Sequence, residues 1–278
     1  MSLDANKLKD ASIRDAYKKA GKKINGSEMA TIIRAALDKK VVSANEKTDL
    51  RKILEHADLT DKARERVDEF LSRSFKLLKG AARKKVVQTI YGAGNVKRIC
   101  FRDPVHGVHY EPRHYEEIAS LIADDDIDVW EYEVAEGYTG KKPLGYYNSS
   151  DDNLFIRKVN RTALQRQSTI VHEATHAIQD KSNVKLPRRD AEAAAHVAQA
   201  VMLLTVDPTE ESLYHRLKRP NILGAARKVL TAKKISVLTE KDFKKMHEDL
   251  ADAYENDTMN FDSEWYSFFE SLAFHLST

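Results

Sequence analysis

Apolar residues recur at intervals of three and four along the first eighty positions or so, the spacing that gathers them on one face of an α-helix. Local start and stop signals divide this region into four predicted helices. They comprise a charged stretch over 4–20 that ends at Gly21, a helix opened by Ser27, one preceded by a Ser43–Glu46 capping box, and one capped by Thr60. The pattern therefore predicts a helical bundle.

Strand-like runs replace this pattern after about Lys84. Residues 86–91 and 96–101 are rich in β-branched and aromatic side chains and flank a Gly-Ala-Gly-Asn turn signal, so we expect a strand on each side of that turn. Residues 128–134 predict another strand, and 146–147 with 154–156 predict a hairpin. Helical periodicity returns after Asn160 and continues to the end.

Together these elements predict a predominantly helical α+β fold in two parts. Residues 1–80 form the helical bundle. Residues 81–278 form a second domain with a small twisted sheet, two long helices and a helical C-terminal extension.

Composition narrows the class of protein. The 278 residues are 42% hydrophobic and 32% charged, which is typical of a soluble globular chain. No apolar stretch approaches the roughly 20 residues that cross a bilayer, and the N-terminus lacks the apolar core of a secretory signal. The single cysteine, Cys100, excludes an internal disulfide framework and fits a reducing compartment. We therefore expect a cytoplasmic protein without a membrane span, while export that needs no signal stays open.

The net charge of +3 is unevenly distributed. No acidic residue lies between Glu69 and Asp103, whereas lysine and arginine are frequent there. Such an excess can attract nucleic acid, phospholipid or an acidic protein. Stacking aromatic residues are not interleaved with these cations as single-strand binders require. We therefore favour pairing of the basic residues with the acidic stretches 124–126 and 151–152.

Residues 172–176 read His-Glu-Ala-Thr-His. Positions i and i+4 of a helix lie one above the other, so His172 and His176 can bind one metal ion. Zinc lowers the pKa of a bound water to about 7, and Glu173 can take up its proton as general base. Thr162 and Gln165 form a capping box for this helix. An apolar arc on the opposite side predicts that one face packs in the core: Leu164, Val171, Ala174 and Ile178.

Catalytic zinc uses three protein ligands and leaves one position for water, so a third ligand is required. The following alanine-rich segment, 188–200, predicts a helix that can pack closely against the first. Glu192, His196 and Gln199 share its polar face. Glu192 is the predicted third ligand; His196 is the alternative, and otherwise supports the ligands. Asp190 is a weaker candidate.

His172, Glu173 and His176, followed by Glu192-Ala193-Ala194-Ala195 on a second helix, resemble the gluzincins. The similarity is greatest to the compact ImmA/IrrE-type metallopeptidases and covers about residues 140–206. It implies a zincin-like fold over 81–278 and a zinc metallopeptidase acting on protein or peptide. His172, His176 and Glu192 would bind zinc, and Glu173 would be general base. The sequence departs from that group at His196, where the group has an aromatic residue.

A zincin also needs a hydrogen-bond donor for the oxyanion of the transition state. Five residues before the motif are candidates for this donor: Tyr146, Tyr147, His109, His114 and Arg157. Tyr147 is the first choice among them.

Two other functions remain possible on the sequence. One is an anionic-surface or nucleic-acid binding protein with a structural or vestigial metal site. The other is a toxin or effector protease whose helical bundle docks a partner.

Overall fold

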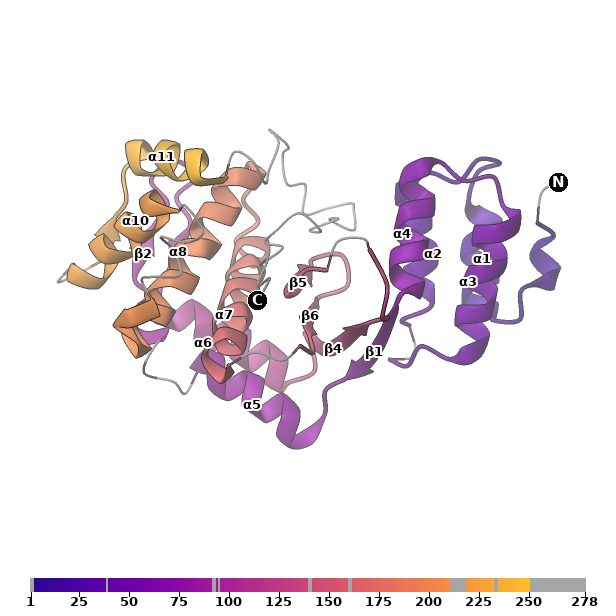
Figure 1. Ribbon diagram of the computed structural model, residues 1–278, viewed down its shortest axis with the longest axis horizontal. Coiled ribbons are helices and arrows are strands. Elements are labelled where there is room, and N and C mark those ends of the chain that lie inside the picture. The colour runs from indigo at the N-terminus through magenta and orange to yellow at the C-terminus, as the bar shows by residue number, and fades with distance from the viewer. Residues whose placement is uncertain are drawn as a thin grey trace.

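The computed structural model describes residues 3–38, 40–91, 94, 96–139, 142–159, 162–210, 219–232 and 235–250. Within them the fold is predominantly helical α+β, as expected (Figure 1). The helical bundle lies at one end, a four-stranded sheet lies in the middle, and the remaining helices lie at the other end. The C-terminal extension beyond Leu250 falls outside the described residues.

The four predicted bundle helices are present, with bounds set by their caps: α1 (Ala11–Lys19), α2 (Gly26–Ala35), α3 (Ala44–His56) and α4 (Asp61–Leu71). The Ser43–Glu46 capping box and the Thr60 cap are confirmed. The expected helix over 4–20 is wrong at its start. A short 3-10 turn, η1 (Ala5–Lys7), precedes α1, because Asp10 caps α1 and Asp49 accepts hydrogen bonds from the backbone of Lys9 and Asp10.

The central sheet is mixed and has the order β1-β4-β6-β5. Its strands are β1 (Arg73–Leu77), β4 (Asp128–Val134), β6 (Asn153–Arg157) and β5 (Gly145–Asn148). The predicted hairpin is β5 paired antiparallel with β6. Strand β1 enters the sheet directly after α4, so the bundle gives way to the sheet at Ser72, before the expected boundary at residue 80.

The strands predicted over 86–91 and 96–101 are wrong. Residues 80–91 form a helix, α5 (Gly80–Tyr91), because Val86 and Ile90 are one turn apart and are buried on the side that packs against α6 (Pro112–Ala123). The second run begins with a 3-10 turn, η2 (Val96–Arg98). Only its end is extended, in β2 (Phe101–Arg102), which pairs with β3 (His109–Tyr110) and β7 (Ser236–Val237).

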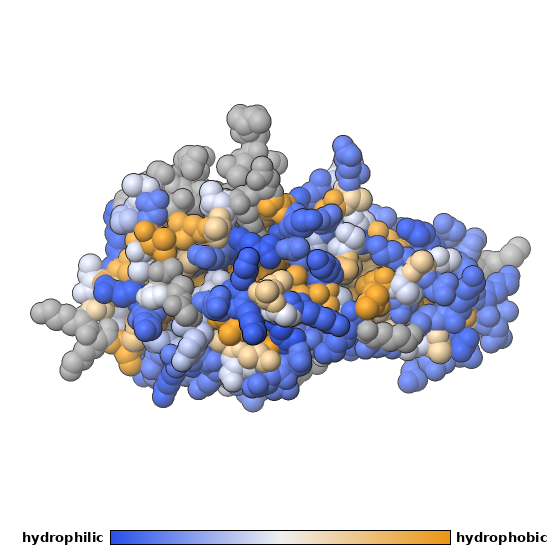
Figure 2. Space-filling model, turned by 90° about the horizontal axis from the view of Figure 1, so that it is seen from below, coloured by the Kyte–Doolittle hydropathy of each residue, from blue (hydrophilic) through white to orange (hydrophobic). Residues whose placement is uncertain are grey.

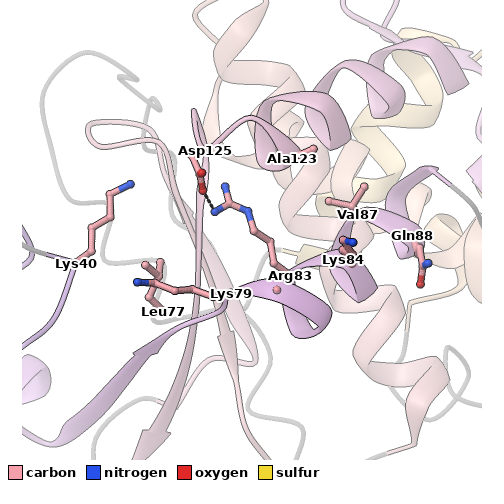
Figure 3. A pocket seen from close by; sticks show the side chains of 10 residues that line it. Lys40, Leu77, Lys79, Arg83, Lys84, Val87, Gln88, Ala123 and Asp125 are labelled. Carbon is pink, nitrogen blue, oxygen red and sulfur yellow. Dashed lines mark hydrogen bonds and ion pairs between the residues drawn. The ribbon is translucent and has the colours of Figure 1, made fainter.

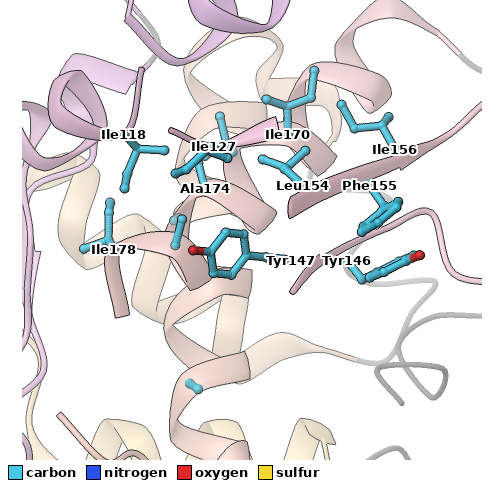
Figure 4. Packing of buried hydrophobic residues seen from close by; sticks show 14 of the residues in the cluster. Ile118, Ile127, Tyr146, Tyr147, Leu154, Phe155, Ile156, Ile170, Ala174 and Ile178 are labelled. Carbon is cyan, nitrogen blue, oxygen red and sulfur yellow. The ribbon is translucent and has the colours of Figure 1, made fainter. Parts of the chain in front are cut away.

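Four helices follow the sheet: α7 (Ala163–Lys181), α8 (Arg188–Val206), α10 (Pro220–Thr231) and α11 (Glu240–Leu250). A 3-10 turn, η3 (Pro208–Glu210), follows α8. Helix α7 lies beside the sheet, and α8 separates it from α10 and α11 (Figure 1). The predicted apolar arc of α7 packs against the hairpin and α6, where Ala174 and Ile178 lie near Tyr147 (Figure 4). The face that carries the histidines is buried as well, since α8 covers it.

The basic residues are partly paired, as favoured from the sequence. Arg83 forms an ion pair with Asp125, in the expected stretch 124–126. Lys40 pairs with Asp128 at 3.0 Å, outside the stretches expected to pair. Both cations line an open cavity of about 730 Å³ where β1 leads into α5 (Figure 3). The face of the molecule seen in Figure 2 is mostly hydrophilic, with apolar residues in separate areas. No helix in the described part of the chain is long and apolar enough to cross a membrane.

Candidate metal centre

Two helices that pack side by side bring the predicted ligands together. The Thr162–Gln165 capping box starts α7, which carries His172 and His176. Residues 182–187 connect it to α8, which carries Glu192. The alanines that follow Glu192 are fully buried, and their small side chains allow the two helix backbones to lie close together.

Donor atoms of three residues converge between these helices. The Nε2 atoms of His172 and His176 are 3.2 Å apart. Glu192 places Oε2 at 3.5 Å from Nε2 of His172 and Oε1 at 3.7 Å from Nε2 of His176. A tetrahedral zinc ion with bonds of about 2.0–2.1 Å holds its ligand atoms about 3.3–3.4 Å apart. The observed separations therefore suit a small ion bound by these three residues.

The orientation of His176 is fixed by Gln179. The amide nitrogen of Gln179 donates to the carbonyl of Ala191 at 2.9 Å and to the hydroxyl of Tyr110 at 3.2 Å. Its oxygen therefore accepts from Nδ1 of His176 at 2.7 Å. Nε2 of His176 is then the unprotonated nitrogen, and it faces His172 and Glu192. A hydrogen bond of this kind on the far nitrogen is typical of a metal-binding histidine.

Glu192 is the most unusual group in the cluster. Its side chain is fully buried, and neither carboxylate oxygen has a hydrogen-bond partner among the described residues. Nδ1 of His172 is likewise buried without such a partner. A buried carboxylate is costly unless a charge or hydrogen bonds compensate it. In the described residues the contacts that face this buried carboxylate are the imidazole nitrogens of His172 and His176.

The protonation states of the cluster follow from burial and from these contacts. Burial lowers the pKa of His176 to about 4. Burial would also lower the pKa of His172, but Glu192 and Glu173 raise it above its usual value. Burial would raise the pKa of Glu192, yet His176 and His172 hold it below its usual value. A neutral His176 and an ionised Glu192 are the forms that bind a metal.

Glu173 lies at one side of the donor atoms. It is buried, and one of its carboxylate oxygens lies within 4.8 Å of ligand atoms of both histidines. The first residue of β5 approaches it closely: a Cβ added to Gly145 would lie 3.0 Å from Cγ and Oε1 of Glu173 and 2.9 Å from Thr169. Glycine at this position therefore lets the edge of the sheet pass directly beside Glu173.

His196 lies one turn beyond Glu192 but has other partners. Its Nε2 accepts a hydrogen bond from Nη1 of Arg219 at 2.8 Å, and its Nδ1 contacts Oε1 of Gln199 at 3.2 Å. Burial and the charge of Arg219 lower the pKa of His196 well below its usual value. Between the two residues predicted as third ligand, Glu192 is therefore the one whose donor atoms are available. Arg219 was not predicted, because no spacing relates it to the motif.

Tyr147 occupies a different environment from the one expected. Its hydroxyl contacts Asp152 at 2.6 Å and Asp180 at 3.0 Å, and its ring packs among apolar side chains (Figure 4). Burial and these two carboxylates raise its pKa far above the usual value. No hydrogen bond in the described part of the chain joins Tyr147 to the cluster. The structure thus gives Tyr147 a packing role and does not bring it to the donor atoms.

The other residues considered for the oxyanion also have partners elsewhere. His109 contacts Glu111 at 3.0 Å, and Arg157 donates to the carbonyl of Lys142 at 2.8 Å. Tyr146 is buried in the sheet, where it stacks on Phe155. His114 lines a separate cavity beside α6.

No family model, curated protein or solved structure matches the chain. The chemistry of the centre is therefore interpreted from its own residues.

Proposed function

We propose that the protein is a zinc-dependent hydrolase of the HExxH type, a gluzincin-like metallopeptidase that cleaves peptide bonds. The observation that carries this proposal is the convergence of His172, His176 and the hydrogen-bond-free carboxylate of Glu192 on one small volume beside Glu173. Two imidazoles and one carboxylate form a donor set of catalytic zinc sites.

Zinc bound there would act as a Lewis acid and lower the pKa of a water molecule. The chain's own contribution is to hold and move protons. Glu173 would accept the proton of the attacking water and pass it to the leaving amine. Gln179 would keep His176 in the tautomer that leaves Nε2 free. Burial of the cluster would limit competing water and strengthen these electrostatic effects.

The sheet edge supports a peptide as substrate. Among the described residues β5 pairs only with β6, so its other edge is not hydrogen-bonded to a strand. An extended peptide can add to such an edge through main-chain hydrogen bonds. Gly145 places the start of this edge next to Glu173, so a peptide aligned there would have its backbone near the general base. The resemblance over residues 140–206 points to the same substrate class.

The test combines metal content with cleavage of a peptide mixture followed by mass spectrometry. Wild type is compared with Glu173→Gln, which keeps the size of the side chain, and with Glu133→Gln, an exposed control on β4. We expect about one zinc per chain in all three proteins, and loss of cleavage by a factor of 10² or more in Glu173→Gln alone. Undiminished cleavage in Glu173→Gln would refute the role of Glu173. A wild type that takes up no zinc would refute the whole proposal.

A further inference from the structure

A fourth potential ligand lies within reach of the cluster. Nε2 of His196 is 3.9 Å from Oε2 of Glu192, and the rings of His196 and His172 have centroids 4.6 Å apart. His172, Glu192 and His196 together form a second group whose ligand atoms lie close enough to hold a metal ion. A site that recruited His196 as well as His172, His176 and Glu192 would have four protein ligands. Such closed sites are structural, because no position is left for water.

Arg219 occupies the nitrogen that His196 would need for coordination. The guanidinium group donates and never accepts hydrogen bonds, so its 2.8 Å contact uses the lone pair of Nε2 of His196. The proton of His196 then lies on Nδ1, where Gln199 can accept it at 3.2 Å. Both ring nitrogens are thus engaged.

Arg219 is unusual because it is a buried cation without an acidic partner in the described part of the chain. Its side chain is 6% exposed at the start of α10, and in the described part of the chain its hydrogen-bonding partner is His196. It forms no ion pair there with an acidic residue. A buried cation without a carboxylate partner is costly, which indicates that something other than stability is gained.

We infer that Arg219 is a positioning residue that keeps His196 out of the metal's coordination sphere and so preserves a three-ligand site with an open position. This inference rests on the proposed metal site. It explains why a histidine can stand one turn from Glu192 without closing that site. Hydrogen bonds to both ring nitrogens keep His196 from coordinating: Arg219 competes with the metal for the lone pair of Nε2, and Gln199 holds the ring through Nδ1.

The experiment counts imidazole ligands by X-ray absorption spectroscopy on zinc-loaded full-length protein. Arg219→Met removes the donor but keeps an unbranched apolar stem. We expect two imidazoles in wild type, three in Arg219→Met, and two again in the double variant Arg219→Met/His196→Asn. Zinc should leave Arg219→Met more slowly than wild type when a chelator is added, and peptide cleavage should be lost. Arg227→Met, on the exposed side of the same helix, should match wild type.

The outcomes separate this inference from the proposed function. Three imidazoles in zinc-loaded wild type, or two in a folded Arg219→Met, would overturn the inference while leaving the metal site in place. If Arg219→Met does not fold, His196→Asn alone decides. It should keep zinc and two imidazoles, whereas a fall in the number of imidazoles would mean that His196 is a ligand after all. Absence of zinc from wild type would remove the proposed function and the inference with it.

Discussion

Replacing Glu192 by glutamine should separate what this residue does for the fold from what it does for a metal. The carboxylate is fully buried, accepts no hydrogen bond from the described residues, and approaches His172 and His176 at 3.5 and 3.7 Å. An amide of the same shape removes the buried charge and can donate a hydrogen bond to Nε2 of His176. His172 can meanwhile lose its proton, so no uncompensated charge is left behind.

The magnitudes follow from these contacts. In metal-free protein we expect Glu192→Gln to change the free energy of unfolding by no more than about 1 kcal/mol, the net value of an ordinary hydrogen bond. In wild type, free zinc at about 1,000 times its dissociation constant should add about 4 kcal/mol. For a chain of this size that corresponds to a rise of about 8 °C in the melting temperature. Glu192→Gln should lose most of this rise.

The assay is thermal unfolding followed by circular dichroism, with chelator or with buffered free zinc. Glu133→Gln is the matched control, because its carboxylate is half exposed and pairs with Lys158 on the surface. A full zinc-dependent rise in Glu192→Gln would show that this residue is not a ligand. A loss of more than about 3 kcal/mol in the metal-free variant would instead mean that Glu192 is needed for the fold, as removal of one partner of a buried ion pair predicts.

Three further substitutions test the surroundings of the centre. Gly145→Ala should reduce peptide cleavage at least about tenfold at unchanged zinc content, because its Cβ would crowd Glu173 at 3.0 Å; wild-type kinetics would refute this. Gln179→Met should weaken zinc affinity about 10–100-fold, measured by chelator competition, since His176 loses the acceptor for Nδ1; unchanged affinity would argue against that support. Tyr147→Phe should leave kcat unchanged and cost about 1 kcal/mol in thermal unfolding, whereas a large fall in kcat would restore the catalytic role first predicted for it.

Local chemistry made much of the fold predictable. Capping boxes are short-range hydrogen-bond patterns, so Ser43–Glu46 and Thr162–Gln165 mark helix starts independently of tertiary structure. The strand expected over 86–91 was wrong because its β-branched residues indicate extended structure while its tertiary environment favours a helix. Val86, Thr89 and Ile90 are all buried, and this i, i+3, i+4 spacing places them on one face of a helix, whereas Thr89 would face the opposite side of a strand.

In the candidate site, too, the residues related by local helix geometry were predictable, whereas those that depend on tertiary packing were not. His172 and His176 are neighbours through helix geometry alone, and Glu192 could be chosen because it shares the polar face of the next helix. Arg219 follows a separate segment, and its contact with His196 depends on how α10 packs on α8. Tyr147 was expected beside the cluster, but the residue of β5 that approaches Glu173 is Gly145, two positions earlier. Gly145 and Tyr147 point to the same side of β5 but lie about 6.6 Å apart along it, so only the glycine is beside Glu173.

The dimensions of the centre argue for a metal ion over a buried water molecule. The two Nε2 atoms are 3.2 Å apart, and each has one Glu192 oxygen at 3.5 or 3.7 Å, close to the roughly 3.3–3.4 Å between ligand atoms of a tetrahedral zinc ion. A water oxygen lies about 2.7–3.0 Å from each hydrogen-bond partner, so partners arranged tetrahedrally around it would be about 4.4–4.9 Å apart. A divalent cation would accept both imidazole lone pairs and neutralise the carboxylate at once, so it would satisfy all the donor groups that converge here.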